Sequence, residues 1–222
     1  IVIDVKIGNG QSFFKHTQPA YWSIHGPVIK GKKATYAIRY SKYNDIKIIE
    51  QWYRMNKATN LEEWTDAMNL MAMPMFNAGY ADNKGNILYV YNASIPIRNE
   101  NYNWQKVVPG NTSETLWDDY IAYELLPQVL NPESGFIQNC NSSPYQTTLN
   151  NNPKKILSKT AGIEEFITNR ALRALETFAI DDNITYEEFK KYKFDLMYSQ
   201  DSYMKVLIDR SIDLLKNKKN FK

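Results

Sequence analysis

Apolar and polar residues alternate with a period of two near the start of the chain. Residues 1–7 (IVIDVKI) place apolar side chains at every odd position, and the turn-forming residues Gly8-Asn9-Gly10 follow. Residues 34–40 (ATYAIRY) form a second short run of this kind. Because a period of two is typical of a strand with one buried face, residues 1–43 are predicted to be rich in β-structure.

The pattern then changes to a helical period over residues 44–73, where apolar side chains recur at i, i+3 and i+4 from Ile46 onward. Asn60, followed by Glu63, predicts the N-terminus of a second helix, because an Asn side chain can accept a hydrogen bond from the backbone three residues later. Pro74 predicts the end of this helical region, since proline cannot continue a helix.

Two strands are predicted next, at about residues 75–81 and 86–92, and the turn Asp82–Gly85 joins them as a hairpin. Residues 93–135 carry many turn signals and little periodicity. Such a long irregular segment inside a compact domain is more often functional than accidental. Residues 136–140 (FIQNC) are predicted to form a short strand.

The last part of the chain is predicted to be helical. One apolar stripe runs from Ile163 to Phe178, Thr185 with Glu188 forms a capping box, and a final helix is expected over about residues 202–215. The predicted class is therefore α+β. Its regions are β-rich over 1–43 and 74–145 and helical over 44–73 and 160–216.

Composition and charge exclude some functions. No apolar run reaches the length of about eighteen residues that a membrane-spanning helix needs, so no membrane span is predicted. The formal net charge is only +3, and the basic runs are not interleaved with stacking aromatic residues, which argues against nucleic-acid binding. A single cysteine, Cys140, allows no internal disulfide, and two histidines argue against a zinc site.

The side chains that most often carry catalysis do not form a complete set. His25 is interpreted as a buried, hydrogen-bonded residue at a strand end, and Cys140 has no evident partner base. Four polar residues remain at predicted strand ends: Asn77, Arg98, Asn139 and Asn141. An asparagine amide is a neutral donor that can stabilise a developing oxyanion. Alternatively, such a residue caps a neighbouring backbone group.

Several short motifs occur in a recognisable order. Residues 77–89 follow the pattern N-x-x-x-A-D-x-x-G-N-I-x-Y, and residues 96–98 follow P-x-R. Residues 131–144 (NPESGFIQNCNSSP) and 23–28 (SIHGPV) supply two further motifs. Together they resemble the penicillin acylase (penicillin amidase) family of N-terminal nucleophile hydrolases, over about residues 15 to 215. Residues 51–58 also resemble members that cleave acyl-homoserine lactones.

This resemblance implies part of an Ntn-hydrolase αββα sandwich with inserted and C-terminal helices, and residues 1–222 would be a single fragment of the large subunit. In the family, a precursor cuts itself to expose a serine whose own α-amino group acts as base, and the enzyme cleaves N-acyl amides through a serine acyl-enzyme. Residue 1 is Ile, so we expect the nucleophile to lie upstream and the isolated fragment to be inactive. No cofactor is expected and no metal ligand is assigned. The resemblance leaves open whether the full-length parent binds a structural calcium.

The resemblance also assigns site residues. Asn77 would be the side-chain oxyanion donor, and Arg98 would orient it. Asn139 and Asn141 would line the same region, while Met75 and Phe76 would be acyl-pocket wall or core.

The expected partners are a small N-acyl amide and the remaining segments or small subunit of the same precursor, without nucleic acid or membrane. A periplasmic or exported location and a role in antibiotic metabolism are family expectations. Two alternatives stay open: an acyl-homoserine lactone acylase, and a non-catalytic relative that acts as a binding or scaffold protein.

Overall fold

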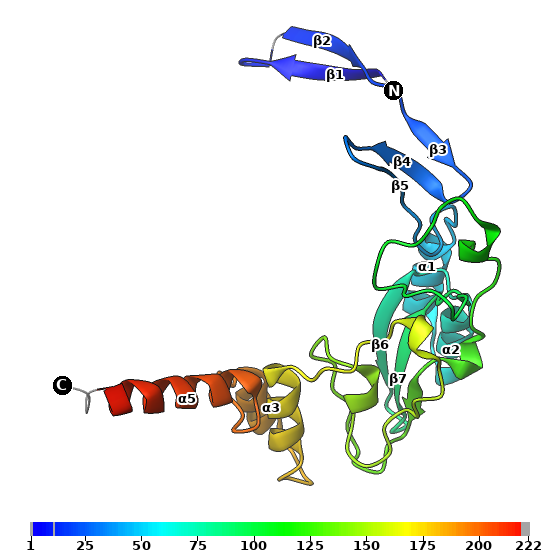
Figure 1. Cartoon of the computed structure of the whole chain (residues 1–222). Helices are drawn as coiled ribbons and strands as arrows, with labels where there is room; N and C mark the ends of the chain where they lie inside the picture. Colours follow the sequence, from blue (N-terminus) through cyan, green and yellow to red (C-terminus); the bar gives the residue numbers. More distant parts are fainter. Residues whose placement is uncertain (1, 11, 219–222) are drawn as a thin grey trace.

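The structure, a computed structural model, describes residues 2–10 and 12–218. Figure 1 shows an elongated arrangement in which small β-hairpins lead into a central α/β body, and helices follow at the C-terminal end. The mixture confirms the predicted α+β class. No helix in the described part of the chain is long and apolar enough to cross a membrane.

The N-terminal region consists of two small antiparallel sheets. Strands β1 (Val2–Ile7) and β2 (Ser12–Thr17) form one, and β3 (Tyr21–Ser23), β4 (Gly26–Lys30) and β5 (Thr35–Ala37) form the other in the order β3-β4-β5. The prediction of a β-rich start is confirmed.

Gly26 in the His25-Gly26-Pro27 motif has a structural reason. Its φ of 131° lies in a region that L side chains rarely adopt, and a Cβ atom there would lie 2.2 Å from the carbonyl oxygen of Ile38. Only glycine therefore allows β4 to approach the chain that follows β5.

Two helices follow, α1 (Ile48–Lys57) and α2 (Leu61–Asn69). The predicted cap of α2 is confirmed, because the Asn60 Oδ1 accepts a hydrogen bond from the Glu63 N–H at 3.0 Å. The helix ends at Asn69, before Pro74, and Met71 leaves the helical region with a φ of 42°.

The central sheet contains β6 (Met75–Ala81), β7 (Ile87–Ala93) and β8 (Gln128–Leu130) in the order β6-β7-β8, all antiparallel. The hairpin predicted at 75–81 and 86–92 is confirmed to within one residue. The turn is fixed by Asp82, whose Oδ1 accepts from the backbone N–H groups of Lys84 at 2.9 Å and Asn86 at 3.0 Å. Gly85, with a φ of 86°, completes the turn.

Helices α1 and α2 cover one face of this sheet (Figure 1). Trp52 packs edge-on against Phe76, with ring centroids 5.4 Å apart, and Trp64 packs against Tyr80 at 5.3 Å. Phe76 and Tyr80 alternate along β6 with Met75, Asn77 and Gly79, which face the other way. The chain thus supplies one helical layer and one sheet layer of the expected sandwich.

Irregular chain covers the opposite face of the sheet. It contains the short 3₁₀ helices η1 (Ser113–Thr115), η2 (Tyr123–Leu125), η3 (Pro144–Gln146) and η4 (Lys159–Ala161). A Cβ atom on Gly79 would lie 3.5 Å from the Ile137 side chain, and Ala161 and Ile163 pack against the core.

The strand predicted over residues 136–140 is wrong. This segment is held by one buried side chain, because the Gln138 Oε1 accepts from the Cys140 N–H at 2.9 Å and its Nε2 donates to the Gln146 carbonyl at 2.5 Å. Side-chain hydrogen bonds within a loop have replaced the ladder that a strand would need.

The C-terminal helices are α3 (Asn169–Phe178), α4 (Tyr186–Lys193) and α5 (Tyr203–Lys218). The predicted capping box of α4 and the predicted last helix are confirmed. The helix predicted from Ile163 begins only at Asn169, because Thr168 caps it and residues before it pack against the core in non-helical conformation.

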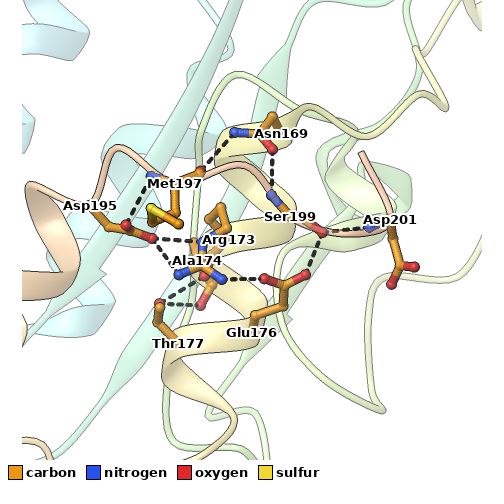
Figure 2. Close-up of polar contacts among 9 residues, drawn as sticks. All are labelled: Asn169, Arg173, Ala174, Glu176, Thr177, Asp195, Met197, Ser199 and Asp201. Carbon is orange, nitrogen blue, oxygen red and sulfur yellow. Dashed lines mark hydrogen bonds and ion pairs between the residues drawn. The ribbon is translucent and has the colours of Figure 1, made fainter. Parts of the chain in front are cut away.

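A polar cluster fastens the α4–α5 connection to α3, as Figure 2 shows. Arg173 forms ion pairs with Glu176 and Asp195, each at 2.6 Å, and the Ser199 hydroxyl donates to Glu176. The Asn169 Oδ1 accepts from the Ser199 N–H at 2.9 Å. These contacts hold the segment that precedes α5 against α3.

Candidate active site

Asn77 lies in the middle of β6, and its side-chain oxygen has one partner. Gly79 pairs directly with Tyr89 of β7, so the side chain of Asn77, two residues before Gly79, projects from the same face as Tyr89. The Tyr89 hydroxyl donates a hydrogen bond to the Asn77 Oδ1 at 2.7 Å. Tyr89 is only 2% exposed, so this contact is made inside the protein.

The amide nitrogen of Asn77 is free for another acceptor. Across residues 2–10 and 12–218, the Asn77 Nδ2 donates no hydrogen bond, and the side chain is half-buried rather than enclosed. Since Tyr89 holds the oxygen, the NH₂ group is directed away from it. A fixed, neutral N–H donor of this kind is what stabilises a developing oxyanion in acyl transfer.

The two tyrosines of β7 on this face stay protonated. Burial raises the pKa of the Tyr89 hydroxyl far above its ordinary value, and the neighbouring Thr147 side chain offsets this only in part. Burial also raises the pKa of Tyr91, which lies opposite Asn77 and donates to the Glu164 Oε2 at 3.4 Å. Both hydroxyls are therefore permanent hydrogen-bond donors.

Arg98 lies between two tryptophans and the η4 segment. Its Nη1 donates to the carbonyl oxygen of Thr160 at 2.7 Å, and its guanidinium carbon lies 5.0 Å from the ring centre of Trp117 and 5.7 Å from that of Trp104. Burial lowers its pKa, and its buried Nε has no partner among the described residues.

Arg98 makes no hydrogen bond to Asn77 within the described residues. The two are linked indirectly, because residues 160–164 bind Arg98 at one end and Tyr91 at the other. Its predicted orienting role therefore stays a prediction, and Tyr89 makes the direct contact with Asn77.

Asn139 and Asn141 lie together in the loop after Gln138, and both are exposed. The Asn139 Oδ1 accepts from the Asn141 N–H at 3.1 Å, and the Asn141 Oδ1 accepts from Arg170 at 3.0 Å. Asn141 has a φ of 54°, a left-handed conformation that asparagine tolerates well. In the described part of the chain, neither residue makes a hydrogen bond to Asn77.

The structure separates Met75 from Phe76. Met75 lies on the Asn77 face of β6 and is 51% exposed, so it borders the space in front of the amide. Phe76 points to the other face, against Trp52 of α1. Strand alternation thus leaves Met75 as a neighbour of Asn77 and gives Phe76 a packing contact.

The other polar candidates are placed as follows. His25 is 9% exposed, which confirms its predicted burial, but its Nε2 has no hydrogen-bond partner among the described residues. Burial raises the pKa of Cys140, despite the nearby charge of Arg170, which disfavours a thiolate nucleophile.

Tyr89 is the hydrogen-bond partner of Asn77 that the motifs did not single out. It occupies the last position of the N-x-x-x-A-D-x-x-G-N-I-x-Y motif. The alternation along residues 87–93, which places Tyr89 and Tyr91 on one face, was the available signal. The hairpin register, which brings Tyr89 beside Asn77, was not visible in the sequence.

Comparisons with known proteins show which proteins this chain is similar to. The sequence profile of the family described as penicillin amidase matches residues 1–219. Penicillin G acylase of Escherichia coli is 31% identical over 147 residues, which is 64% of this chain and 17% of that protein. Acyl-homoserine lactone acylase PvdQ of Pseudomonas fluorescens is 26% identical over 175 residues, which is 65% of this chain and 22% of that protein.

A solved structure has the same fold. The thermostable penicillin G acylase from Alcaligenes faecalis superposes with a TM-score of 0.67 at 22% identity, covering 86% of this chain and 33% of that one. The chain therefore spans well under half the length of the relatives that it matches.

Proposed function

The chain belongs to the penicillin amidase family, and we propose that it forms one segment of an amidohydrolase that cleaves N-acyl amides through a serine acyl-enzyme. In this proposal the serine lies outside the chain, in the part of the protein that these residues do not cover. The contribution of the chain is the side-chain half of the oxyanion hole.

The observation that carries the proposal is the state of the Asn77 amide. Its oxygen is bound by Tyr89 at 2.7 Å, while its nitrogen has no partner in the described residues. An amide that only capped local structure would donate its N–H groups to neighbouring carbonyl oxygens. Within the described residues, this one leaves its N–H groups without an acceptor, in a half-buried position on β6, an edge strand of the central sheet.

The chemistry follows from this placement. The serine oxygen attacks the acyl carbon, a C–O bond forms, and the carbonyl electron pair moves onto the oxygen. The Asn77 N–H stabilises that negative charge. The C–N bond then breaks, the amine leaves with the proton taken from the serine, and water hydrolyses the resulting ester.

Arg98 is proposed to support this site through the η4 segment. Its hydrogen bond to Thr160 and its packing against Trp117 hold residues 160–164 against the face of the sheet that carries Asn77. Met75, exposed on that face, is proposed to border the acyl group of the substrate.

The similarity to PvdQ favours a second candidate, the hydrolysis of acyl-homoserine lactones. Both candidates share the amide carbonyl chemistry at Asn77 and differ in the acyl chain and in the amine. A substrate panel that varies the acyl group therefore separates them.

The test uses protein expressed from the full reading frame. We expect intact mass and N-terminal sequencing to show two chains, the larger beginning at a serine, and amine release from phenylacetyl or long fatty-acyl anilides. The 222-residue chain expressed alone should release no amine. A full-length protein that stays uncut and inactive on the whole panel would overturn the proposal in favour of a binding or scaffold protein.

A further inference from the structure

We propose that Tyr89 is a positioning residue, which fixes the Asn77 amide so that its N–H groups rather than its oxygen face the reacting carbonyl. This inference rests on the proposed function, since it assigns to Tyr89 a role in the same acyl transfer.

An asparagine needs such a partner because its amide is nearly symmetric in shape. Rotation by half a turn about the last side-chain bond exchanges the oxygen and the nitrogen at little steric cost. With the oxygen forward, Asn77 would repel an oxyanion instead of stabilising it. The Tyr89 hydroxyl, 2.7 Å from the Asn77 Oδ1, keeps the oxygen at the back.

Tyr89 can do this because its own position is fixed on both sides. It lies in the central strand of the sheet, paired with Gly79 of β6 and with Val129 of β8. Gly79 has no side chain, and Ile137 from the covering loop approaches this position, so the ring lies in a closed, packed space.

The Tyr89 hydroxyl also keeps the proton that it donates to Asn77. Burial holds the pKa of Tyr89 far above its ordinary value, so the hydroxyl keeps its proton throughout the range in which an amidase works. A donor that never ionises gives Asn77 the same orientation at every working pH.

Tyr123 provides a matched control. It belongs to the same core and is 6% exposed, but its hydroxyl has no hydrogen-bond partner among the described residues. Tyr123→Phe therefore removes a buried hydroxyl from a similar environment without touching Asn77. Any loss common to Tyr89→Phe and Tyr123→Phe reports packing alone.

The experiment measures kcat and KM of the full-length, processed protein. We expect Tyr89→Phe to lower kcat about tenfold to a hundredfold with KM changed less than about twofold, and Tyr123→Phe to change neither. A boronic-acid analogue of the tetrahedral intermediate should lose affinity for Tyr89→Phe in the same proportion as kcat. A kcat loss equal in the two variants, or absent from Tyr89→Phe, would overturn the proposal.

A double-mutant cycle tests whether Tyr89 acts through Asn77. In an Asn77→Ala background, Tyr89→Phe should cause no further loss of kcat, because nothing remains to be oriented. A further loss of the same size as in the wild-type background would show an independent role and overturn the inference.

A second variant keeps the test valid if the Tyr89→Phe protein does not fold or process itself. Incorporation of 4-aminophenylalanine at position 89 keeps the ring and an N–H donor, and should keep kcat within about threefold of wild type. Activity as low as that of Asn77→Ala would contradict the positioning role. An inactive wild-type protein would instead overturn the proposed function, so the two failures are distinguishable.

Discussion

The Arg98 guanidinium donates to the carbonyl oxygen of Thr160, 62 residues away in the chain, at 2.7 Å. This contact fastens η4 to the chain that follows β7, and Glu164 comes shortly after η4 in the sequence. A Cβ atom on Gly162 would lie 3.4 Å from the same guanidinium, so the arginine side chain packs closely against the backbone of this loop. The arginine therefore positions a whole loop rather than a single side chain.

We accordingly predict that Arg98→Lys lowers kcat of the full-length protein by about tenfold or more, because lysine cannot reproduce the planar fork or its packing on Trp117. Hydrogen exchange should quicken over residues 157–164 in the same variant. Arg54→Lys, on the exposed face of α1, is the control and should change neither quantity. Unchanged exchange over residues 157–164 in Arg98→Lys would contradict the predicted role.

A second prediction concerns the interface between α1 and the central sheet. Gln51 is fully buried, donates to the Asn92 Oδ1 at 2.9 Å and accepts from the Ala72 N–H at 2.7 Å. Gln51→Leu leaves the Asn92 Oδ1 and the Ala72 N–H without these hydrogen bonds. Each unsatisfied buried group costs about 1–3 kcal/mol of stability. Urea unfolding should show this loss in the free energy of unfolding.

Gln105→Leu, at an exposed position, is the control for this variant and should be nearly neutral. If Gln51→Leu proved as stable as wild type, apolar packing would have compensated for the lost hydrogen bonds, and the buried network would not be a source of stability.

Local signals in the sequence were sufficient for much of the fold. The Asn60 cap, the Thr185–Glu188 capping box and the hairpin around Asp82 each depend on residues within a few positions of one another, and each was predicted. Residues 136–140 were predicted wrongly because the Gln138 side chain bonds backbone groups of its own loop, which the apolar pattern does not show. The start of α3 was predicted wrongly because Ile163 packs against the core, which contains distant parts of the chain.

The candidate site also divides into residues that local sequence signals predicted and residues that they did not. Asn77 was found because it belongs to a motif, whereas its partner Tyr89 depends on strand register, which the motif does not state. Phe76 and Met75 are neighbours in sequence, and only the observed pairing shows that one faces α1 and the other the site.

A third prediction concerns pH and the β6–β7 turn. Hydrogen bonds, first from the Asn86 side chain and also from backbone N–H groups, lower the pKa of Asp82 from 3.8 to about 2. Because the folded-state pKa is below the unfolded value, ionised Asp82 stabilises the protein above about pH 4. That contribution is lost as pH falls through about 2.

Asp82→Asn should therefore be less stable than wild type at neutral pH, and the difference should shrink as pH falls from about 4 to about 2. Unfolding midpoints of both proteins across this range provide the measurement. Asp66→Asn, at an exposed position of α2, is the control. A difference that stayed constant with pH would mean that the Asp82 charge does not stabilise the turn.

The last prediction tests the central assignment. Asn77→Ala in the full-length protein should lower kcat about 100- to 1000-fold, because it removes the side-chain donor to the oxyanion. Folding should stay intact, since the side chain is half-buried and makes only one hydrogen bond in the described part of the chain. Asn139→Ala, which removes an exposed amide of the nearby loop, should retain most of its activity. Near-normal turnover in Asn77→Ala would mean that the amide is a structural group, and the hydrogen bond from Tyr89 would then serve packing alone.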